Sequence, residues 1–224
     1  MKEDLKLRLN VQGELDYEPS VDSSHLTVTT HSGLVLLSGT VRSFAEKLAA
    51  VRAAERVSGV REVSDLIRVT LSADHQRTDT EIVHDAQEAL RLFPHGGVMV
   101  QVEDGWATLE GKVNWQFERR SAYDAVAALV GVKGVENLIT LKPQASPHLD
   151  SGEIEASIRR AFVRRSNLHA EQVRVEVVSG HVSLSGHLTS WTERKEAARA
   201  AWNVAGVTSV ENHIGFGIRS WSDS

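Results

Sequence analysis

A seven-residue pattern with glycine at both ends and leucine at its fifth position occurs three times, and this repetition limits the possible folds more than any other feature. The copies begin at Gly33, Gly105 and Gly180. Each is followed, at the same offsets and without a gap, by a glutamate, an alanine, a glycine and a valine; the glutamates are Glu46, Glu118 and Glu193. Repetition at a fixed period indicates a repeated structural unit. The sequence therefore predicts three copies of one small domain.

The three copies divide the chain of 224 residues into domains that we place at residues 1–71, 78–142 and 151–218. Polar stretches join them, and the second stretch holds two of the four prolines. The chain has no cysteine, so disulfide bonds and thiolate chemistry are excluded. Apolar cores alone must therefore hold domains of about 70 residues, a size at which one core gives modest stability.

The first copy shows the order of the elements. Leu5 and Leu9 have helical spacing in a predicted helix over residues 2–10. Alternating apolar residues over 25–30 and 35–41 predict a β-hairpin, and residues 60–71 predict a third strand. Between them, a capping box formed by Ser43 and Glu46 starts a second helix that ends near Val57. The order α-β-β-α-β is repeated in the other copies.

Alternation along the middle strand predicts how the layers pack. In the first copy Val35, Leu37, Gly39 and Val41 share one face, whereas Ser38 lies on the other. Both helices must cover the apolar face, and a right-handed crossover over a helix makes the second and third strands parallel. We therefore predict an α+β protein of three repeated two-layer domains, each with two helices on one face of a three-stranded mixed sheet.

The second glycine of each pattern lies on the apolar face, where a side chain would ordinarily be favoured. These glycines are Gly39, Gly111 and Gly186. Glycine inside a strand commonly marks a bulge or a close backbone approach. We interpret them as structural glycines and expect a helix to pass close to each one.

The last element of each copy completes a recognisable pattern. After the helix, the copies read Gly-Val-x-x-Val-x-Asn-x-Ile over residues 59–67, 131–139 and 206–214, except that Asp65 replaces the asparagine in the first copy. His213 breaks the apolar alternation in the third. Together with Gly-x-Val-x-Leu-x-Gly-x-Val, this resembles the BON domain of bacterial osmotically inducible periplasmic proteins and outer-membrane lipoproteins. The resemblance covers nearly the whole chain.

The resemblance implies a non-catalytic module, associated in several relatives with phospholipid membranes and envelope integrity. Those relatives are typically exported, but the charged first residues lack the apolar core of a secretory signal. We therefore expect a cytoplasmic protein if Met1 is the natural start, and a periplasmic one if a signal peptide has been removed. No apolar run approaches the roughly 20 residues that span a bilayer. The formal charge of −5 supplies no basic field, so nucleic acid is not an expected partner.

One basic cluster could contact a membrane. Arg159, Arg160, Arg164 and Arg165 lie in the predicted first helix of the third copy, and arginine binds phosphate groups well. The alternative is a solvated helix face, opposite a buried stripe formed by Ile154, Ile158, Ala161 and Phe162. The neutral formal charge of this copy favours the solvated face.

No pattern predicts a metal site, a cofactor or an active site. His181 and His187 flank the third hairpin strand but have no third ligand at zinc-like spacing, so we interpret them as exposed. The glutamates shared by all copies are accounted for by helix capping. The repeated glycine pattern is a strand and not a phosphate loop, because apolar residues alternate through it. We therefore predict that the protein is not an enzyme.

Tryptophans and exposed leucines are the better indication of partners. Trp115 and Trp191 lie at the starts of second helices, and Leu34 and Leu36 lie near or on the polar face of the first sheet. They could equally form contacts between copies. We predict a stress-related binding or scaffolding protein with a protein partner. Two alternatives stay open: a peripheral protein that binds anionic phospholipid, and a small-ligand or ion sensor that uses a cleft between domains.

Overall fold

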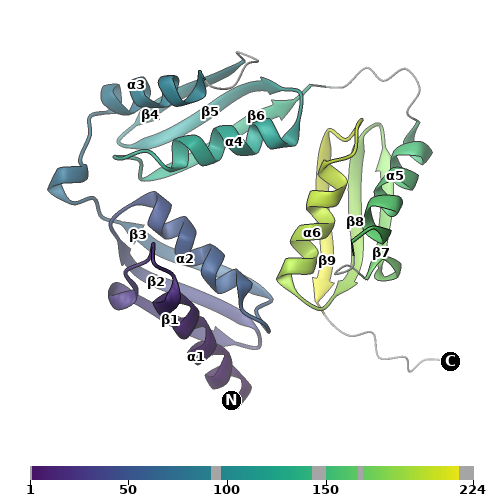
Figure 1. Cartoon of the computed structure of the whole chain (residues 1–224), viewed down its shortest axis with the longest axis horizontal. Helices are drawn as coiled ribbons and strands as arrows, with labels where there is room; N and C mark the ends of the chain where they lie inside the picture. Colours follow the sequence, from purple (N-terminus) through teal and green to yellow (C-terminus); the bar gives the residue numbers. More distant parts are fainter. Residues whose placement is uncertain (1, 92–96, 143–149, 166–168, 217–224) are drawn as a thin grey trace. The chain divides into compact units, whose positions relative to one another are not determined.

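The computed structural model describes residues 2–91, 97–142, 150–165 and 169–216. Each repeat has two helices and three strands in the predicted order (Figure 1). Repeat 1 contains α1 (Lys2–Tyr17), β1 (Leu26–His31), β2 (Leu34–Val41), α2 (Phe44–Arg56) and β3 (Glu62–Val69). Repeat 2 contains α3 (Asp79–Leu90), β4 (Val98–Glu103), β5 (Trp106–Val113), α4 (Gln116–Ala127) and β6 (Gly134–Leu141). Repeat 3 contains α5 (Ser151–Val163), β7 (Val173–Val178), β8 (His181–Leu188), α6 (Trp191–Trp202) and β9 (Ser209–Phe216).

The three sheets have the same topology, with the second strand of each repeat in the middle. The hairpins β1–β2, β4–β5 and β7–β8 are antiparallel, whereas β2–β3 and β8–β9 are parallel. This confirms the predicted α+β fold of repeated two-layer domains with mixed sheets. Figure 1 shows both helices of each repeat packed on one side of its sheet. No helix among the described residues is long and apolar enough to cross a membrane.

The core of each repeat lies between its helices and its sheet. In repeat 1, Val35 and Leu37 of β2 are buried against small residues of α2, including Ala50 and Ala54. Repeat 3 builds the same core, with Val182 and Leu184 of β8 beneath alanines of α6. Because alanine has a short side chain, the helix can approach the sheet closely.

The first helix differs from its prediction. It runs to Tyr17, and its buried residues are Leu7, Val11 and Leu15, whereas Leu5 and Leu9 are 50% and 60% exposed. The predicted end at residue 10 was wrong, and Leu5 and Leu9, whose spacing indicated the helix, do not form its buried face. Leu7, Val11 and Leu15 follow each other at intervals of four, which is one face of a helix. That face continues through Gly13, because a glycine on the exposed side of a helix weakens it without ending it.

The repeated glycines have a backbone that favours glycine, but neither α-helix of their repeat is their close neighbour. In repeats 1 and 3 the close residue is the last one of a short 3₁₀ turn. Gly39 has φ +130°, and a Cβ atom there would overlap the carbonyl oxygen of His25, just before β1. A Cβ at Gly111 would overlap the carbonyl oxygen of Gly97, and one at Gly186 that of Gln172. The expectation of a packing helix at these points is therefore wrong. The close group is the main chain that enters the neighbouring strand of the hairpin.

A side-chain clamp joins each second helix to the last strand. In repeat 3 the Asn212 amide donates to the carbonyl oxygen of Arg194 at 3.1 Å, and the Arg194 guanidinium donates to the carbonyl oxygen of Asn212 at 3.0 Å. Asn137 and Arg119 form the same exchange in repeat 2. The departure at Asp65 is matched on the helix, where Lys47 replaces arginine and forms an ion pair at 2.9 Å. The clamp therefore persists in repeat 1 with different chemistry.

Candidate binding surfaces

Arg159 and Arg160 lie on the exposed side of α5, and Arg164 and Arg165 follow its last residue, with Arg165 half-buried. Arg159 Nε pairs with Glu155 at 2.9 Å, and Arg160 donates to the Ser157 hydroxyl at 2.8 Å. Arg165 donates to the carbonyl oxygen of Ala161 at 3.0 Å. Arg164 is the C-cap residue of the helix.

The buried side of α5 is the predicted stripe, formed by Ile154, Ile158, Ala161 and Phe162. Since the arginines take positions around the opposite side, their geometry is that of a solvated helix face. The four arginines do not converge on one point in these contacts. Lipid binding by this cluster stays a prediction.

A second group of cations surrounds an aromatic pair in repeat 3. Trp191 at the start of α6 stacks on Phe216 at the end of β9, with 6.0 Å between ring centroids. The Arg194 guanidinium lies 5.2 Å from the Trp191 ring and 5.6 Å from the Phe216 ring. Lys195 Nζ lies 5.7 Å from the Trp191 ring. We call Trp191, Arg194, Lys195 and Phe216 the aromatic cluster.

Sequence reasoning named Trp191 but not the other three residues of the aromatic cluster. Arg194 and Lys195 lie one turn after Trp191 on the same helix, and this spacing could have indicated them. Phe216 comes from a different element, so only the strand order brings it to Trp191. Cations over aromatic rings contribute attraction that is larger where water is excluded.

Glu193 is a buried charged residue, 8% exposed, and it does more than cap α6. Thr189 donates its amide at 2.8 Å and its hydroxyl at 2.7 Å to the carboxylate, and His169 Nδ1 lies 2.7 Å from the other oxygen. Burial alone raises the pKa of Glu193, but the hydrogen bonds from Thr189 and His169 outweigh it and hold the pKa below its ordinary value of 4.5. Ser190 accepts from the Glu193 amide, as the predicted capping box requires.

The equivalent glutamate of repeat 1 links the same two segments. Glu46 accepts the amide of Arg42 at 2.7 Å and the amide of Asp22 at 2.9 Å. Asp22 and His169 both precede the short 3₁₀ turn before the first strand of their repeats. These glutamates therefore tie that turn to the second helix, which is a structural role.

His181 and His187 lie on the same side of a regular strand, and His181 contacts the Ser209 hydroxyl at 2.5 Å. Among the described residues, no group of three His, Cys, Asp or Glu side chains could hold a metal ion.

A cleft of about 490 Å³ lies beside the N-terminus of α3. Its charged groups hold the main chain around them: Asp79 accepts the amides of Asp104 and Gly105, and Lys133 donates to the carbonyl oxygen of Asp104. Arg77 donates to two carbonyl oxygens of the preceding loop. The cleft is lined by Leu71, by the segment that follows it and by residues of repeat 2.

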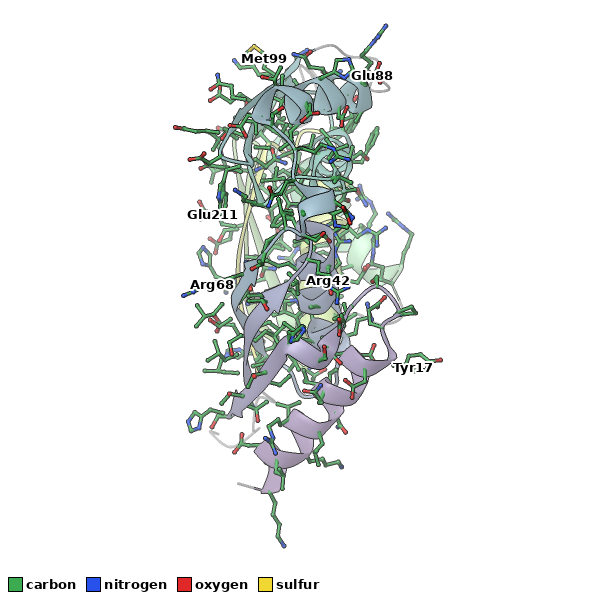
Figure 2. The ribbon with its side chains drawn as sticks, turned by 90° about the vertical axis from the view of Figure 1, so that its left-hand side faces the viewer. Tyr17, Arg42, Arg68, Glu88, Met99 and Glu211 are labelled. Atoms are coloured by element: carbon green, nitrogen blue, oxygen red, sulfur yellow. The ribbon has the colours of Figure 1, made fainter. Side chains whose placement is uncertain are left out.

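The open side of the second sheet, which no helix of its repeat covers, carries large apolar side chains. Met99, Trp106 and Leu138 are 64%, 60% and 48% exposed, and come from β4, β5 and β6. Figure 2 shows Met99 projecting away from the ribbon. The Trp106 ring lies against Gly134, where a Cβ atom would overlap it. We call this surface the tryptophan face.

The other tryptophans have different surroundings. Trp115 is 38% exposed, and Trp202 packs against the core of repeat 3. Trp221 lies outside the described residues. On the first sheet Leu34 is 47% exposed and Leu36 is half-buried. Trp106 is one of the tryptophans visible in the sequence, but sequence reasoning missed Met99 and Leu138. Leu138 directly precedes the buried Ile139, and this alternation could have placed it on the open side.

The sequence and the fold can be compared with known proteins. Osmotically-inducible protein Y of Escherichia coli (strain K12) is 29% identical over 147 residues, which are 62% of this chain and 73% of that protein. Two structures of CdsD, a structural protein of the type III secretion system of Chlamydia trachomatis, share 15% and 16% identity with the chain. They cover 96% and 95% of this chain and 98% and 92% of their own, with TM-scores of 0.27 and 0.28, which are too low to indicate a shared overall arrangement.

A family model described as the BON domain matches residues 3–70, 78–143 and 150–217, which is nearly the whole chain. Each match covers one repeat of the structure. The mixed sheets and paired helices of all three repeats agree with the fold that the resemblance implied. The chain therefore belongs to the BON domain family, with three tandem copies of the domain.

Proposed function

We propose that this chain is a non-catalytic binding protein of the response to osmotic stress, and that it holds a protein partner on the tryptophan face. The stress role is supported by the similarity to a protein named as osmotically inducible. The structural role of Glu46 and Glu193 supports a non-catalytic function, since both carboxylates accept hydrogen bonds from main-chain amides.

The main support for a docking role is the set of residues on the tryptophan face. Tryptophan and methionine are enriched at protein interfaces, and a few large aromatic residues supply most of the binding energy. Here Met99, Trp106 and Leu138 come from three adjacent strands and lie on one face of the sheet, with Met99 opposite Glu110, four residues along β5 from Trp106. Exposed patches of this kind mark interaction sites.

The test is site-specific photo-crosslinking in osmotically stressed source cells. With a crosslinking residue at Gln101, on the same face, we expect discrete crosslinked bands that the Met99→Ser/Trp106→Ser variant loses. The control is Tyr17→Ser/Val163→Ser, because these side chains are 84% and 77% exposed elsewhere on the chain. Both variants should keep the parent circular dichroism. Bands that survive the loss of Met99 and Trp106 would contradict the proposed docking surface.

A second function, peripheral binding to anionic phospholipid, is supported by the aromatic cluster. Tryptophan prefers the level of the lipid headgroups, and Arg194 and Lys195 add positive charge beside it. This cluster fits a lipid surface better than the arginines of α5, which lie apart from aromatic rings in the described contacts.

Co-sedimentation with anionic liposomes at low salt separates the two basic surfaces. We expect the Arg194→Glu/Lys195→Glu variant to lose at least about thirtyfold in binding, since each of the two lost cations contributes roughly 1 kcal/mol. Its circular dichroism is compared with that of the parent protein, because Arg194 also donates to the carbonyl oxygen of Asn212. The matched Arg160→Glu/Arg164→Glu variant should bind as the parent protein does. If the parent protein stays in the supernatant, the lipid function is wrong; if only the α5 variant loses binding, the surface is wrong.

A further inference from the structure

The open side of the third sheet carries three histidines. The register of β8 and β9 places His181, His187 and His213 on one face of the sheet. Leu184 and Ile214 point to the other face and are buried in the core. His181, His187 and His213 are all exposed. The His187 ring lies over Gly215, 3.4 Å from the position of a Cβ there. We call this surface the histidine face.

The charge of the histidine face depends on the imidazoles. Its other charged groups are Arg174 and Glu176 on β7, and Glu211 on β9, which is labelled in Figure 2. With neutral imidazoles, one arginine against two glutamates leaves one net negative charge. With three protonated imidazoles the face has two net positive charges. Imidazole is the side chain that ordinarily changes charge between pH 5 and 8.

The histidines are specific to this repeat. The positions of His181 hold Leu34 and Trp106 in the other repeats, the positions of His187 hold Thr40 and Lys112, and the positions of His213 hold Leu66 and Leu138. A feature absent from two of three copies is not needed for the fold. The three histidines therefore indicate a role that is specific to repeat 3.

The tryptophan face has the complementary charge. Glu103, Glu110 and Glu136 point to the same open side as Trp106, and Lys112 is the basic residue among them. Three glutamates and one lysine leave two net negative charges around the apolar patch. Two faces of one chain thus become opposite in sign when the imidazoles are protonated.

We propose that, at mildly acidic pH, the histidine face of one copy of this chain docks on the tryptophan face of a second copy. This inference rests on the docking role proposed for the tryptophan face and names its partner. Two sheets can pack face to face, about 10 Å apart. Protonated imidazoles then meet the glutamates, and one can lie over the Trp106 ring as a cation.

The pairing joins two different faces, so an open assembly has a free histidine face at one end and a free tryptophan face at the other. Such head-to-tail contacts form either rings or open chains of copies. A three-stranded face about eight residues long measures roughly 14 by 25 Å, which is small for a stable interface. The association is therefore weak and shows only at high protein concentration.

The test is sedimentation equilibrium of the full chain over a range of concentrations at about pH 5.5 and about pH 8. We expect association at least about tenfold tighter at the lower pH, and weakened by about 0.5 M NaCl. His181→Asn/His187→Asn/His213→Asn should abolish it. The control, His25→Asn/His75→Asn/His84→Asn, removes the same number of imidazoles from exposed positions off this face and should associate as the parent does.

A mixing experiment tests the pairing of the two faces. Glu103→Gln/Glu110→Gln/Glu136→Gln should also stop association on its own, but mixed with the histidine variant it should form dimers that grow no further, since each variant keeps one intact face. If the control variant with three other histidines replaced lost association to the same extent, the cause would be the net charge of the whole chain near its isoelectric point. That result would overturn the proposal. If the chain became more compact at low pH at every protein concentration, the two faces would pair within one chain. That result would also overturn the proposal. If association fails while the Gln101 crosslinks persist, the proposed docking function stands and only this partner is wrong.

Discussion

Replacing Gly39 by valine is expected to lower the free energy of unfolding of repeat 1 by about 3 kcal/mol. Two costs combine. A φ of +130° is a conformation that residues with a Cβ rarely adopt, and the new Cβ would overlap the carbonyl oxygen of His25. The overlapped group is main chain held in the sheet, since Leu26 is paired with Gly39, so it cannot move aside without breaking the hairpin.

Hydrogen exchange measured by mass spectrometry is the suitable readout, because it follows the protection of β1 and β2 separately from the other repeats. A chain of three domains need not unfold in one step, so a single melting temperature would be ambiguous. We expect the Gly39→Val variant to lose protection in repeat 1 and to keep it in repeat 3.

Gly13→Ala is the matched control. Gly13 lies in the middle of α1, has no strained φ, and a Cβ there would meet nothing within 4 Å. Alanine should therefore stabilise the helix by about 0.5 to 1 kcal/mol. If the two substitutions changed the protection of repeat 1 in the same direction, the close approach at Gly39 would not be the cause.

Periodicity in the sequence was enough to predict the repeats, the order of elements and the mixed sheets, because each of these depends on residues close together in the chain. Of the capping boxes predicted at Ser43, Thr78 and Ser190, the one at Thr78 is complete. Ser43 and Ser190 cap their helices, but Glu46 and Glu193 accept from amides other than that of the capping serine. The partner of Gly39 could not be predicted in the same way. A glycine inside a strand shows that something comes close, but the identity of the neighbour depends on pairing with a strand more than ten residues away.

The same limit applies to the surfaces. Leu5 and Leu9 have helical spacing and so do Leu7, Val11 and Leu15, and only packing against the sheet decides which set is buried. Only Trp191 of the aromatic cluster was found, for a similar reason, since Phe216 comes to it through the strand β9. The histidine face requires the register of two strands, because His213 lies more than 25 residues after His187.

The second large effect is expected at Glu193. Replacing it by glutamine should cost repeat 3 about 2 kcal/mol at neutral pH, since hydrogen bonds to a charged acceptor contribute more than neutral ones. The amide cannot accept from the amide and hydroxyl of Thr189 and from His169 as the carboxylate does. A control is Glu171→Gln, an exposed change in the 3₁₀ turn (Ala170–Gln172) beside His169 that should alter stability little.

The effect should depend on pH in a definite direction. The folded protein holds the pKa of Glu193 below 4.5, because the hydrogen bonds outweigh the effect of burial. The folded state therefore binds this proton less readily than the unfolded state, and stability rises with pH in this range. The contribution is complete above the unfolded value and is lost as the pH falls through the folded pKa. The difference in protection of α6 between the parent protein and Glu193→Gln should be largest near neutral pH and shrink below pH 4.5. A difference that stayed constant down to the folded pKa would show that the lost charge is not its source, and that glutamine acts only through a change in packing.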